Sequence, residues 1–277
     1  MGIPFLLLGI GLGMRRPAVF AVAVLAAFIV VVGVDRDGLW YLDRAWGVLA
    51  GGCFVALTLF RPSSGFSGRA LGAVAVAAVV AAFLLSVQAQ AWGTVEWVFR
   101  ERMADGVGTA VQALVLFRGG DSLPPATVAK IYDAVEMQAV VFPAVLGVAT
   151  LASLGVAWWL YVRLSTGSDQ GVGPLRDFRF NDHLVWLFIG GLVLLLLRWE
   201  AVSAQIGANA VVFMGVLYAL RGAAVVMFLS GGLSLLGYVL VAFGLVFLPP
   251  LVLTGAMVIG IGDTWLDVRR KVREPTP

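Results

Sequence analysis

The chain contains several separate apolar runs, each long enough to cross a lipid bilayer. A membrane-spanning helix needs about 20 predominantly apolar residues, because the hydrocarbon core is about 30 Å thick. No water is present in that core, so backbone N–H and C=O groups must bind one another within each helix. The share of hydrophobic residues, 61%, and of charged residues, 13%, agrees with this reading. The sequence therefore predicts an all-α, polytopic transmembrane helical bundle that forms a single integral membrane domain over residues 1–277.

Hydropathy and tryptophan placement together define the expected spans. Tryptophan prefers the membrane interface, where one part of its ring is in apolar surroundings and the other is wet. Trp92, Trp186 and Trp265 each fall at the end of an apolar run. The expected spans are residues 17–34, 45–60, 70–92, 138–162, 183–199, 206–228 and 235–262. They make seven passes, or eight if the last region crosses once more.

The first residues form a shorter apolar segment. The stretch "GIPFLLLGIGLGM" has no basic residue before it and is followed by Arg15 and Arg16. This order differs from that of a secretory signal, and the run is short for a span. We expect either a re-entrant or half helix, or a chain whose natural start lies further upstream.

One sizeable polar segment, residues 93–137, interrupts the apolar runs, with four basic and six acidic residues. Apolar side chains recur in it at steps of three and four residues, the spacing of a helix with one apolar face. Gly119 and Gly120 end this helix, and a second one begins near Pro124 and Pro125, where a missing N–H costs little. The apolar face consists of Val95, Val98, Phe99, Met103, Val107, Val111, Leu114 and Val115. The segment predicts an extramembrane amphipathic helical hairpin that lies on the membrane or caps the bundle.

The basic residues allow two readings of residues 203–262. With two passes and a turn at "SGGLS", Arg176 and Arg179 lie opposite the basic tail, which contradicts the positive-inside rule. With three passes and a turn at Arg221, the basic groups fall on one side. The second turn would then lie near "VAFG", which offers no polar group to water. The sequence leaves both readings open.

Charged and polar residues in the last spans are candidate substrate-binding groups. An arginine inside one continuous helix over residues 206–228 would need a buried partner or a watery cavity. Counting 1.5 Å per residue, Asp263 lies level with Asn209 in the two-pass reading and with Arg221 in the three-pass reading. Either pair could form the polar floor of a small-molecule pocket. The candidate set is Asn209, Arg221, Asp263 and Asp267.

A simpler interpretation exists for the two aspartates of this set. Asp263 and Asp267 are four residues apart and share a helix face, where like charges repel unless a cation or a donor lies between them. They would then pair with Arg270 and Lys271 one turn further on, at the membrane interface.

The stretch "PLRDFRFNDHLVW", residues 174–186, holds the only histidine of the chain and immediately precedes an apolar run. We interpret it as the interfacial collar of a membrane helix rather than a reaction centre, because basic and aromatic groups gather at membrane interfaces. Asn181 or Asp182 can cap the helix that follows. The collar residues are Arg176, Arg179, Asn181, Asp182, His183 and Trp186.

The sequence gives little support to enzyme chemistry. It has no G-x-S-x-G, H-E-x-x-H or complete phosphate-loop motif, and the single cysteine, Cys53, excludes an intrachain disulfide and a multi-cysteine metal site. His183 and Asp182 are sequence neighbours and point to different helix faces, which disfavours an intramembrane acid–base pair. We expect no catalytic activity, no metal and no cofactor. Membrane lipids and other membrane proteins are the expected partners rather than nucleic acid, because the net charge of +3 comes from short collars and a basic tail.

Three stretches taken together resemble a known family. They are "LPPATVAKIYDAVEMQAVVFPAVLGVATLASLGVAWWLYVRL", "PLRDFRFNDHLVWLFIGGLVLLLL", and "NAVVFMGVLYALRGAAVVMFLS" leading to "GIGDTWLDVRR". Over residues 120–270 the chain resembles the YybS-like family of bacterial multi-spanning membrane proteins of unknown function. The multi-helix build of that family looks like the substrate-binding components of energy-coupling-factor vitamin transporters, an analogy of architecture that transfers no residue.

Two functional hypotheses follow. The first is a small-molecule binding or transport component of the bacterial inner membrane, whose candidate polar residues would line a cavity between the last helices. The alternative is a non-transporting scaffold that recruits other proteins of the cell envelope through the hairpin over residues 93–137.

Overall fold

The computed structural model describes residues 38–87, 91–117, 119, 123–166, 171–197, 201–232 and 234–273, together with Pro4, Leu8 and Gly9. Every regular element within these ranges is a helix. The expected span at residues 17–34 and most of the expected N-terminal apolar segment lie outside the described residues.

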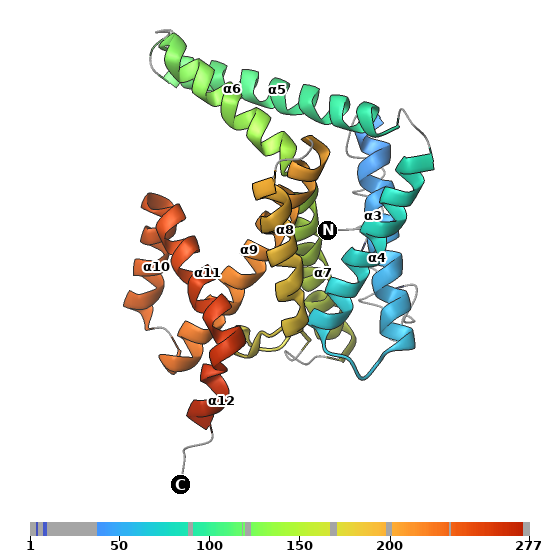
Figure 1. Cartoon of the computed structure of the whole chain (residues 1–277), viewed down its shortest axis with the longest axis vertical. Coiled ribbons are helices and arrows are strands. Elements are labelled where there is room, and N and C mark those ends of the chain that lie inside the picture. The colour runs from blue at the N-terminus through green and yellow to red at the C-terminus, as the bar shows by residue number, and fades with distance from the viewer. Residues whose placement is uncertain are drawn as a thin grey trace.

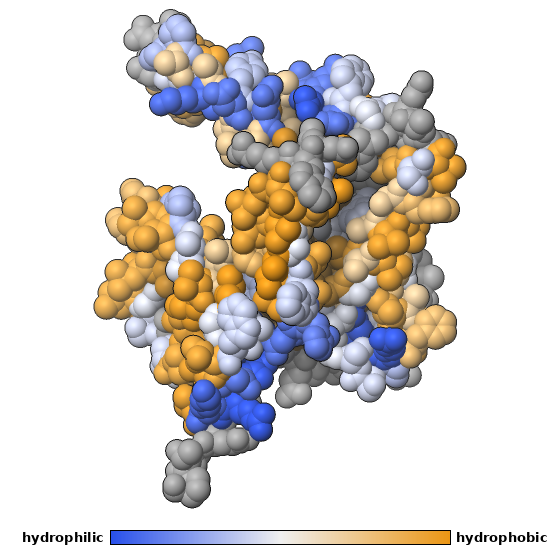
Figure 2. Space-filling view, in the orientation of Figure 1, coloured by the Kyte–Doolittle hydropathy of each residue, from blue (hydrophilic) through white to orange (hydrophobic). Residues whose placement is uncertain are grey.

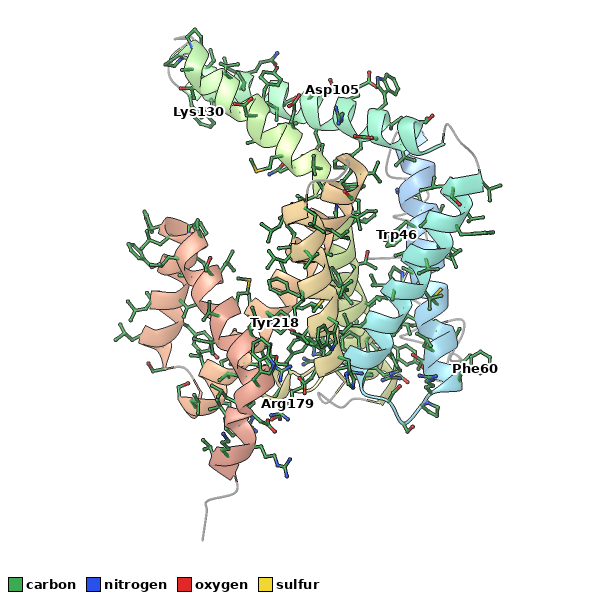
Figure 3. All side chains as sticks on the ribbon, in the orientation of Figure 1. Trp46, Phe60, Asp105, Lys130, Arg179 and Tyr218 are labelled. Atoms are coloured by element: carbon green, nitrogen blue, oxygen red, sulfur yellow. The ribbon has the colours of Figure 1, made fainter. Side chains whose placement is uncertain are left out.

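One half of the bundle consists of α3 (Gly38–Phe60), α4 (Phe66–Val87) and α7 (Phe142–Thr166). Apolar side chains from all three helices meet in a buried cluster that includes Phe54, Ala73 and Leu154. Trp46 lies within this half, where its Nε1 donates to Oγ1 of Thr150 at 2.8 Å and joins α3 to α7 (Figure 3). The glycine- and alanine-rich sequence of α4 lets it pack closely against both neighbours.

The second half is built around α9 (Ala201–Leu229), the longest helix that the structure describes. It packs against α8 (Val185–Leu197) on one side and α11 (Pro249–Leu266) on another. α10 (Leu235–Phe247) lies at the outer edge beside α11, and the short α12 (Val268–Arg273) follows α11 toward the C-terminus (Figure 1). Two 3₁₀ turns, η1 (Leu175–Asp177) and η2 (Asp182–Leu184), shape the loop before α8.

The helices α5 (Ala91–Phe117) and α6 (Pro125–Val140) lie side by side across one end of the bundle (Figure 1). α6 begins with prolines in its first turn, as expected, and Gly119 adopts a φ of 77° in the connection between the two helices. Seven of the eight apolar positions expected to share a face of α5 are half-buried, whereas Leu114 is exposed. The ring of Phe99 on this face packs against Phe142, where α7 begins.

Among the residues that the structure describes, four helices are long and apolar enough to cross a membrane, namely Phe66–Val87, Phe142–Ser165, Val202–Leu229 and Pro249–Leu266. Three of them, Phe66–Val87, Phe142–Ser165 and Val202–Leu229, agree with expected spans to within five residues at each end, whereas Pro249–Leu266 overlaps only the second half of the expected span at residues 235–262. Three more are apolar but shorter: Arg44–Phe60, Asp182–Leu197 and Leu235–Phe247. Side chains on the flanks of these helices form a broad hydrophobic surface, and hydrophilic residues gather at both ends of the molecule (Figure 2).

The expectation of one span over residues 235–262 is wrong. The chain breaks at Leu248, between α10 and α11, because Pro249 and Pro250 cannot continue the hydrogen-bond ladder of α10 and disfavour helical backbone in the residue before them. The prolines instead occupy the first positions of α11, where their fixed φ suits a helix start.

Each reading of residues 203–262 is correct in part. α9 continues without interruption through Arg221, so the turn there in the three-pass reading is wrong, whereas the turn at "SGGLS" in the two-pass reading is confirmed at residues 230–232. The single helix that the two-pass reading places after this turn is wrong, because α10 and α11 are separate. On α11, Met257 lies against Gly215, Gly260 against Tyr218, and Asp263 against Arg221. Residue numbers increase in the same direction along these contacts, so α9 and α11 are parallel. α10 connects the end of α9 to the start of α11 and runs in the opposite direction.

Candidate functional site

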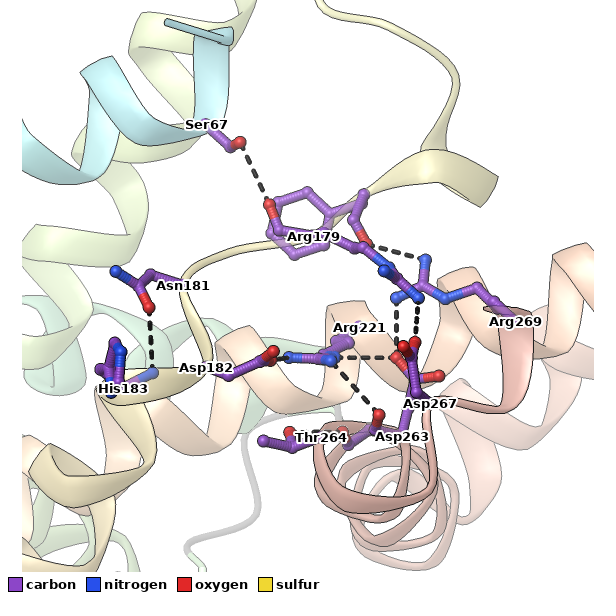
Figure 4. Close-up of polar contacts among 12 residues, drawn as sticks. Ser67, Arg179, Asn181, Asp182, His183, Arg221, Asp263, Thr264, Asp267 and Arg269 are labelled. Atoms are coloured by element: carbon purple, nitrogen blue, oxygen red, sulfur yellow. Dashed lines mark hydrogen bonds and ion pairs between the residues drawn. The ribbon is translucent and has the colours of Figure 1, made fainter. Parts of the chain in front are cut away.

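Arg221 lies at the centre of a buried charged cluster between α9, α11 and the loop before α8 (Figure 4). It is 2% exposed, and its Nε donates to Oδ2 of Asp263 at 3.0 Å. Its Nη1 donates to Oδ1 of Asp182, and its Nη2 donates to the backbone oxygen of Asp263 at 3.4 Å. The face of the guanidinium packs over the ring of Phe180, at 5.5 Å from its centroid. All three guanidinium nitrogens of Arg221 therefore have an acceptor.

Asp263 receives a second arginine. Nη2 of Arg269 donates to the same oxygen, Oδ2, at 2.8 Å, and the carboxylate has no exposed surface. The other oxygen, Oδ1, is buried and has no hydrogen-bond partner. A buried carboxylate with a free acceptor is unusual, since buried polar atoms are nearly always satisfied.

Arg269 completes the group, which we call the charged quartet: Asp182, Arg221, Asp263 and Arg269. Nη1 of Arg269 donates to the backbone oxygens of Arg176 at 3.2 Å and Phe178 at 3.0 Å, so this arginine also holds the loop before α8. Two arginines and two aspartates balance in charge. Three of the four are buried, whereas the Asp182 side chain is 63% exposed and brings the quartet to the surface.

A close approach of α9 and α11 brings the quartet together. A Cβ added to Gly222 would lie 1.8 Å from the backbone oxygen of Ala256, and one added to Gly260 would lie 2.0 Å from that of Tyr218. No side chain fits at either position, so the two backbones touch. Glycine contacts of this kind are typical of helix pairs in membranes.

Asp267 ends α11 in the left-handed region, with a φ of 42° and a ψ of 50°, and its N–H donates to the backbone oxygen of Asp263. This turn redirects the chain so that Arg269, six residues beyond Asp263, reaches back to it. The carboxylate of Asp267 accepts from Nη2 of Arg179 at 2.6 Å in a half-exposed ion pair. The expected pairing of Asp263 with Arg270 or Lys271 is wrong, because the left-handed residue changes which basic side chain faces it.

The four candidate substrate-binding residues do not form one site. Asp263 meets Arg221, as counting depth in the three-pass reading predicted, and Asp267 lies beside them. Asn209 does not join them. Its amide donates to the oxygens of Val140 and Gln205, and its Oδ1 accepts from the N–H of Ala144, so it fastens α9 to the junction of α6 and α7.

The collar residues have different roles, and Arg179 is the one that pairs with Asp267. Asn181 is the cap, since its Oδ1 accepts from the N–H of His183 at 3.0 Å. Arg176, His183 and Trp186 are exposed, and Trp186 has 69% of its surface accessible. Asp182, expected as part of the collar, belongs instead to the quartet. The pairing of Arg269 with Asp263 has no signal in the sequence, where Arg269 is one residue of a basic tail.

The carboxylates of the quartet are already paired with its arginines. No group of three His, Cys, Asp or Glu side chains gathers as metal ligands would in the part of the chain that the structure describes.

Comparison with known proteins places the chain in a family. A family model described as "Predicted membrane protein (DUF2232)" matches residues 1–264, which extends the resemblance noted over residues 120–270 to nearly the whole chain. No curated protein and no solved structure matches the chain significantly. With its apolar helices and a family match over most of its length, the chain belongs to this family of membrane proteins.

Proposed function

We propose that this protein is a multi-pass protein of the bacterial inner membrane that binds or transports a small polar molecule at the charged quartet. The observation that supports the proposal is the burial of Arg221 and Asp263 in helices long enough to span a membrane. Charged groups inside such helices are costly and usually functional. Packing alone does not call for them, since replacing a buried ion pair by apolar residues is often neutral or stabilising.

Asp182 offers a route for the ligand. It is the one member of the quartet on a surface loop, and its carboxylate accepts a hydrogen bond from Nη1 of the buried Arg221. A carboxylate or phosphate group that displaces Asp182 would reach that arginine without separating α9 from α11. The free Oδ1 of Asp263 could accept from a donor on the same ligand.

The basic residues support an orientation. Hydrogen bonds link the start of α4, the loop before α8 and the α11–α12 junction, so Arg176, Arg179 and Arg269 lie at one end of the bundle. By the positive-inside rule this end faces the cytoplasm. α5 and α6 lie at the opposite end and would face outward, as an extramembrane hairpin over residues 93–137 (Figure 1). The ligand would then enter or leave the quartet from the cytoplasm.

A substrate-binding component of a transporter agrees with this arrangement. The build of several apolar helices around a polar group resembles the substrate-binding subunits of energy-coupling-factor transporters in architecture alone. Such a component would form one integral membrane domain over residues 1–277.

The proposal is tested with the double variant Arg221→Met/Asp263→Leu, which removes the central ion pair and keeps apolar volume. Arg269 retains two backbone acceptors in this variant, and the exposed Asp182 can be hydrated. The matched control is Arg179→Gln/Asp267→Asn, which removes a half-exposed pair at the same end. The protein is purified in detergent, and the small molecules bound to it are then extracted and measured by mass spectrometry.

We expect the wild type and the control to carry a small molecule that the double variant, folded by size-exclusion chromatography, lacks. Equal amounts of the same molecules in the wild type and in the double variant would rule out the quartet as the binding site. So would a wild-type protein that carries none.

The alternative, a non-transporting scaffold, is supported by a separate feature. α6 carries an open hollow of about 430 Å³ lined by Lys130, Asp133, Ala134, Met137, Gln138 and Val141. Met137 is 70% exposed, so Met137→Glu would alter this surface without disturbing the bundle, and Phe117→Glu, at a 91% exposed position on α5, is the control. Cross-linking in native membranes should yield a complex with the wild type and the control but not with Met137→Glu. Identical cross-linked species from all three proteins would exclude this surface.

A further inference from the structure

Arg69 is a buried arginine without an acidic partner among the described residues. It lies in the first turn of α4 and is 9% exposed. Its Nε is buried without a hydrogen bond, and no hydrogen bond or ion pair joins its guanidinium to any residue that the structure describes. Arg221 offers a contrast within the same molecule, because all of its nitrogens have acceptors.

Two aromatic rings hold the guanidinium of Arg69. Its Cζ lies 4.7 Å from the ring centroid of Trp158 and 6.0 Å from that of Phe54. Stacking on an aromatic ring stabilises the charge by about 0.5–2 kcal/mol but supplies no hydrogen-bond acceptor. A guanidinium has five N–H donors in its plane, and stacking on its face uses none of them.

The surroundings place this group at the basic end of the bundle. Two residues earlier, the hydroxyl of Ser67 donates to the backbone oxygen of Arg179 at 3.2 Å, and Nε1 of Trp158 donates to the backbone oxygen of Gly171. The start of α4 and its aromatic partner therefore both contact the loop between α7 and α8. Span ends with basic and aromatic groups lie at the depth of lipid headgroups.

We propose that Arg69, held by Trp158 and Phe54, binds a phosphate group. The phosphate oxygens would accept two hydrogen bonds from the edge of the guanidinium while its face stays on the Trp158 ring. A membrane phospholipid and a phosphorylated solute share this chemistry. The site is separate from the quartet and does not depend on the function proposed for it.

The test uses the full chain, purified in dodecyl maltoside, which lacks phosphate. In the first arm, phosphatidylglycerol or a glucosyl-diacylglycerol without phosphate is added, and bound lipid is counted by native mass spectrometry. In the second arm, inorganic phosphate is added and thermal unfolding is followed. The variants are Arg69→Gln, Arg69→Lys and the control Arg61→Gln, an exposed arginine in the turn before α4.

We expect the wild type and Arg61→Gln to bind phosphatidylglycerol and not the glucolipid. Arg69→Gln should bind phosphatidylglycerol about tenfold more weakly, the effect of losing charge-assisted hydrogen bonds. Arg69→Lys keeps the charge without the planar fork and should fall between them, which also serves as the test if Arg69→Gln does not fold. Stabilisation by inorganic phosphate in the wild type but not in Arg69→Gln would assign the site to a soluble phosphate. A response to phosphatidylglycerol alone would assign it to a lipid.

Three results would overturn the proposal. The first is equal binding of the glucolipid and phosphatidylglycerol by the wild type, with no response to phosphate. The second is unchanged affinity in both Arg69 variants. The third is an equal loss in Arg61→Gln, which would mean that diffuse surface charge, not Arg69, attracts the phosphate.

Discussion

Nε of Arg221 donates to Oδ2 of Asp263 at 3.0 Å across 42 positions of sequence, and neither residue is more than 2% exposed. Their depths match because α9 and α11 run parallel with their backbones in contact at Gly222 and Gly260. The ion pair thus depends on the close contact between α9 and α11. Substitutions can alter the ion pair and the helix contact separately.

Removing one charge of this pair should cost much more than removing both. Asp263→Leu leaves two buried arginines short of an acceptor, so we expect a loss of about 3–5 kcal/mol in the free energy of unfolding. The double variant Arg221→Met/Asp263→Leu should regain most of it. Asp182→Asn, which alters the exposed partner of the same arginine, should cost about 1 kcal/mol or less. Reversible denaturation in mixed micelles measures the differences. A double variant as unstable as the single one would show that the pair itself stabilises the helix contact.

The glycine contact predicts a position-specific effect of one methyl group. Gly222→Ala and Gly260→Ala place a Cβ within 2.0 Å of a backbone oxygen, and each should destabilise the protein by about 1–3 kcal/mol as the helices separate. Gly255→Ala is the control, because a Cβ on this residue of α11 meets nothing within 4 Å. Thermal unfolding of the three variants is the measurement. Equal effects at all three positions would contradict the contact, since helix propensity alone favours alanine over glycine at each of them.

The left-handed backbone of Asp267 predicts an order among substitutions. Asp267→Ala places an ordinary residue at a φ of 42° and should cost about 1–2 kcal/mol. Asp267→Gly and Asp267→Asn tolerate this backbone, and they lose only the half-exposed pair with Arg179, for about 1 kcal/mol or less. Melting temperatures should therefore fall furthest for alanine. If asparagine and alanine melt alike, the ion pair is the larger contribution and the backbone argument fails.

The proposed orientation predicts labelling from one side only. In a background with Cys53→Ser, single cysteines at Ser64 and Lys271 should react with a membrane-impermeant maleimide from the cytoplasmic side. Thr127→Cys, exposed at the start of α6, should react from the opposite side. Intact cells and inverted vesicles distinguish the two sides. Labelling of Thr127→Cys and Lys271→Cys from the same side would contradict the orientation.

Hydropathy predicts the all-helical architecture because the bilayer imposes one length and one hydrogen-bond pattern on every span. Hydropathy gives a wrong span where a helix ends inside a continuous apolar run. Residues 235–262 read as one run, yet two consecutive prolines divide it. Proline interrupts a helix through its own backbone, whatever the hydropathy of its neighbours, so this break is predictable from the two prolines in the sequence.

The site was predictable only in part. Depth counting relates Arg221 to Asp263, because rise per residue is fixed in a helix. It cannot relate Arg269 to Asp263, since that contact depends on the backbone turn at Asp267, nor Asp182 to Arg221, which depends on how a loop folds back. Gly222 and Gly260 are two of 34 glycines, and spacing alone does not single them out.

The break at Leu248 has a consequence for the surrounding lipid. A helix of 13 residues such as α10 is about 20 Å long, shorter than the hydrocarbon core by about 10 Å. Ordinary helix starts expose N–H groups that need water, but Pro249 and Pro250 have none, and the N–H of Leu248 already donates to Gly244. The α10–α11 turn therefore has fewer free N–H groups than an ordinary helix start. A bilayer that thins around this edge would match the hydrophobic length of α10, so membrane thickness becomes a variable that acts on this protein.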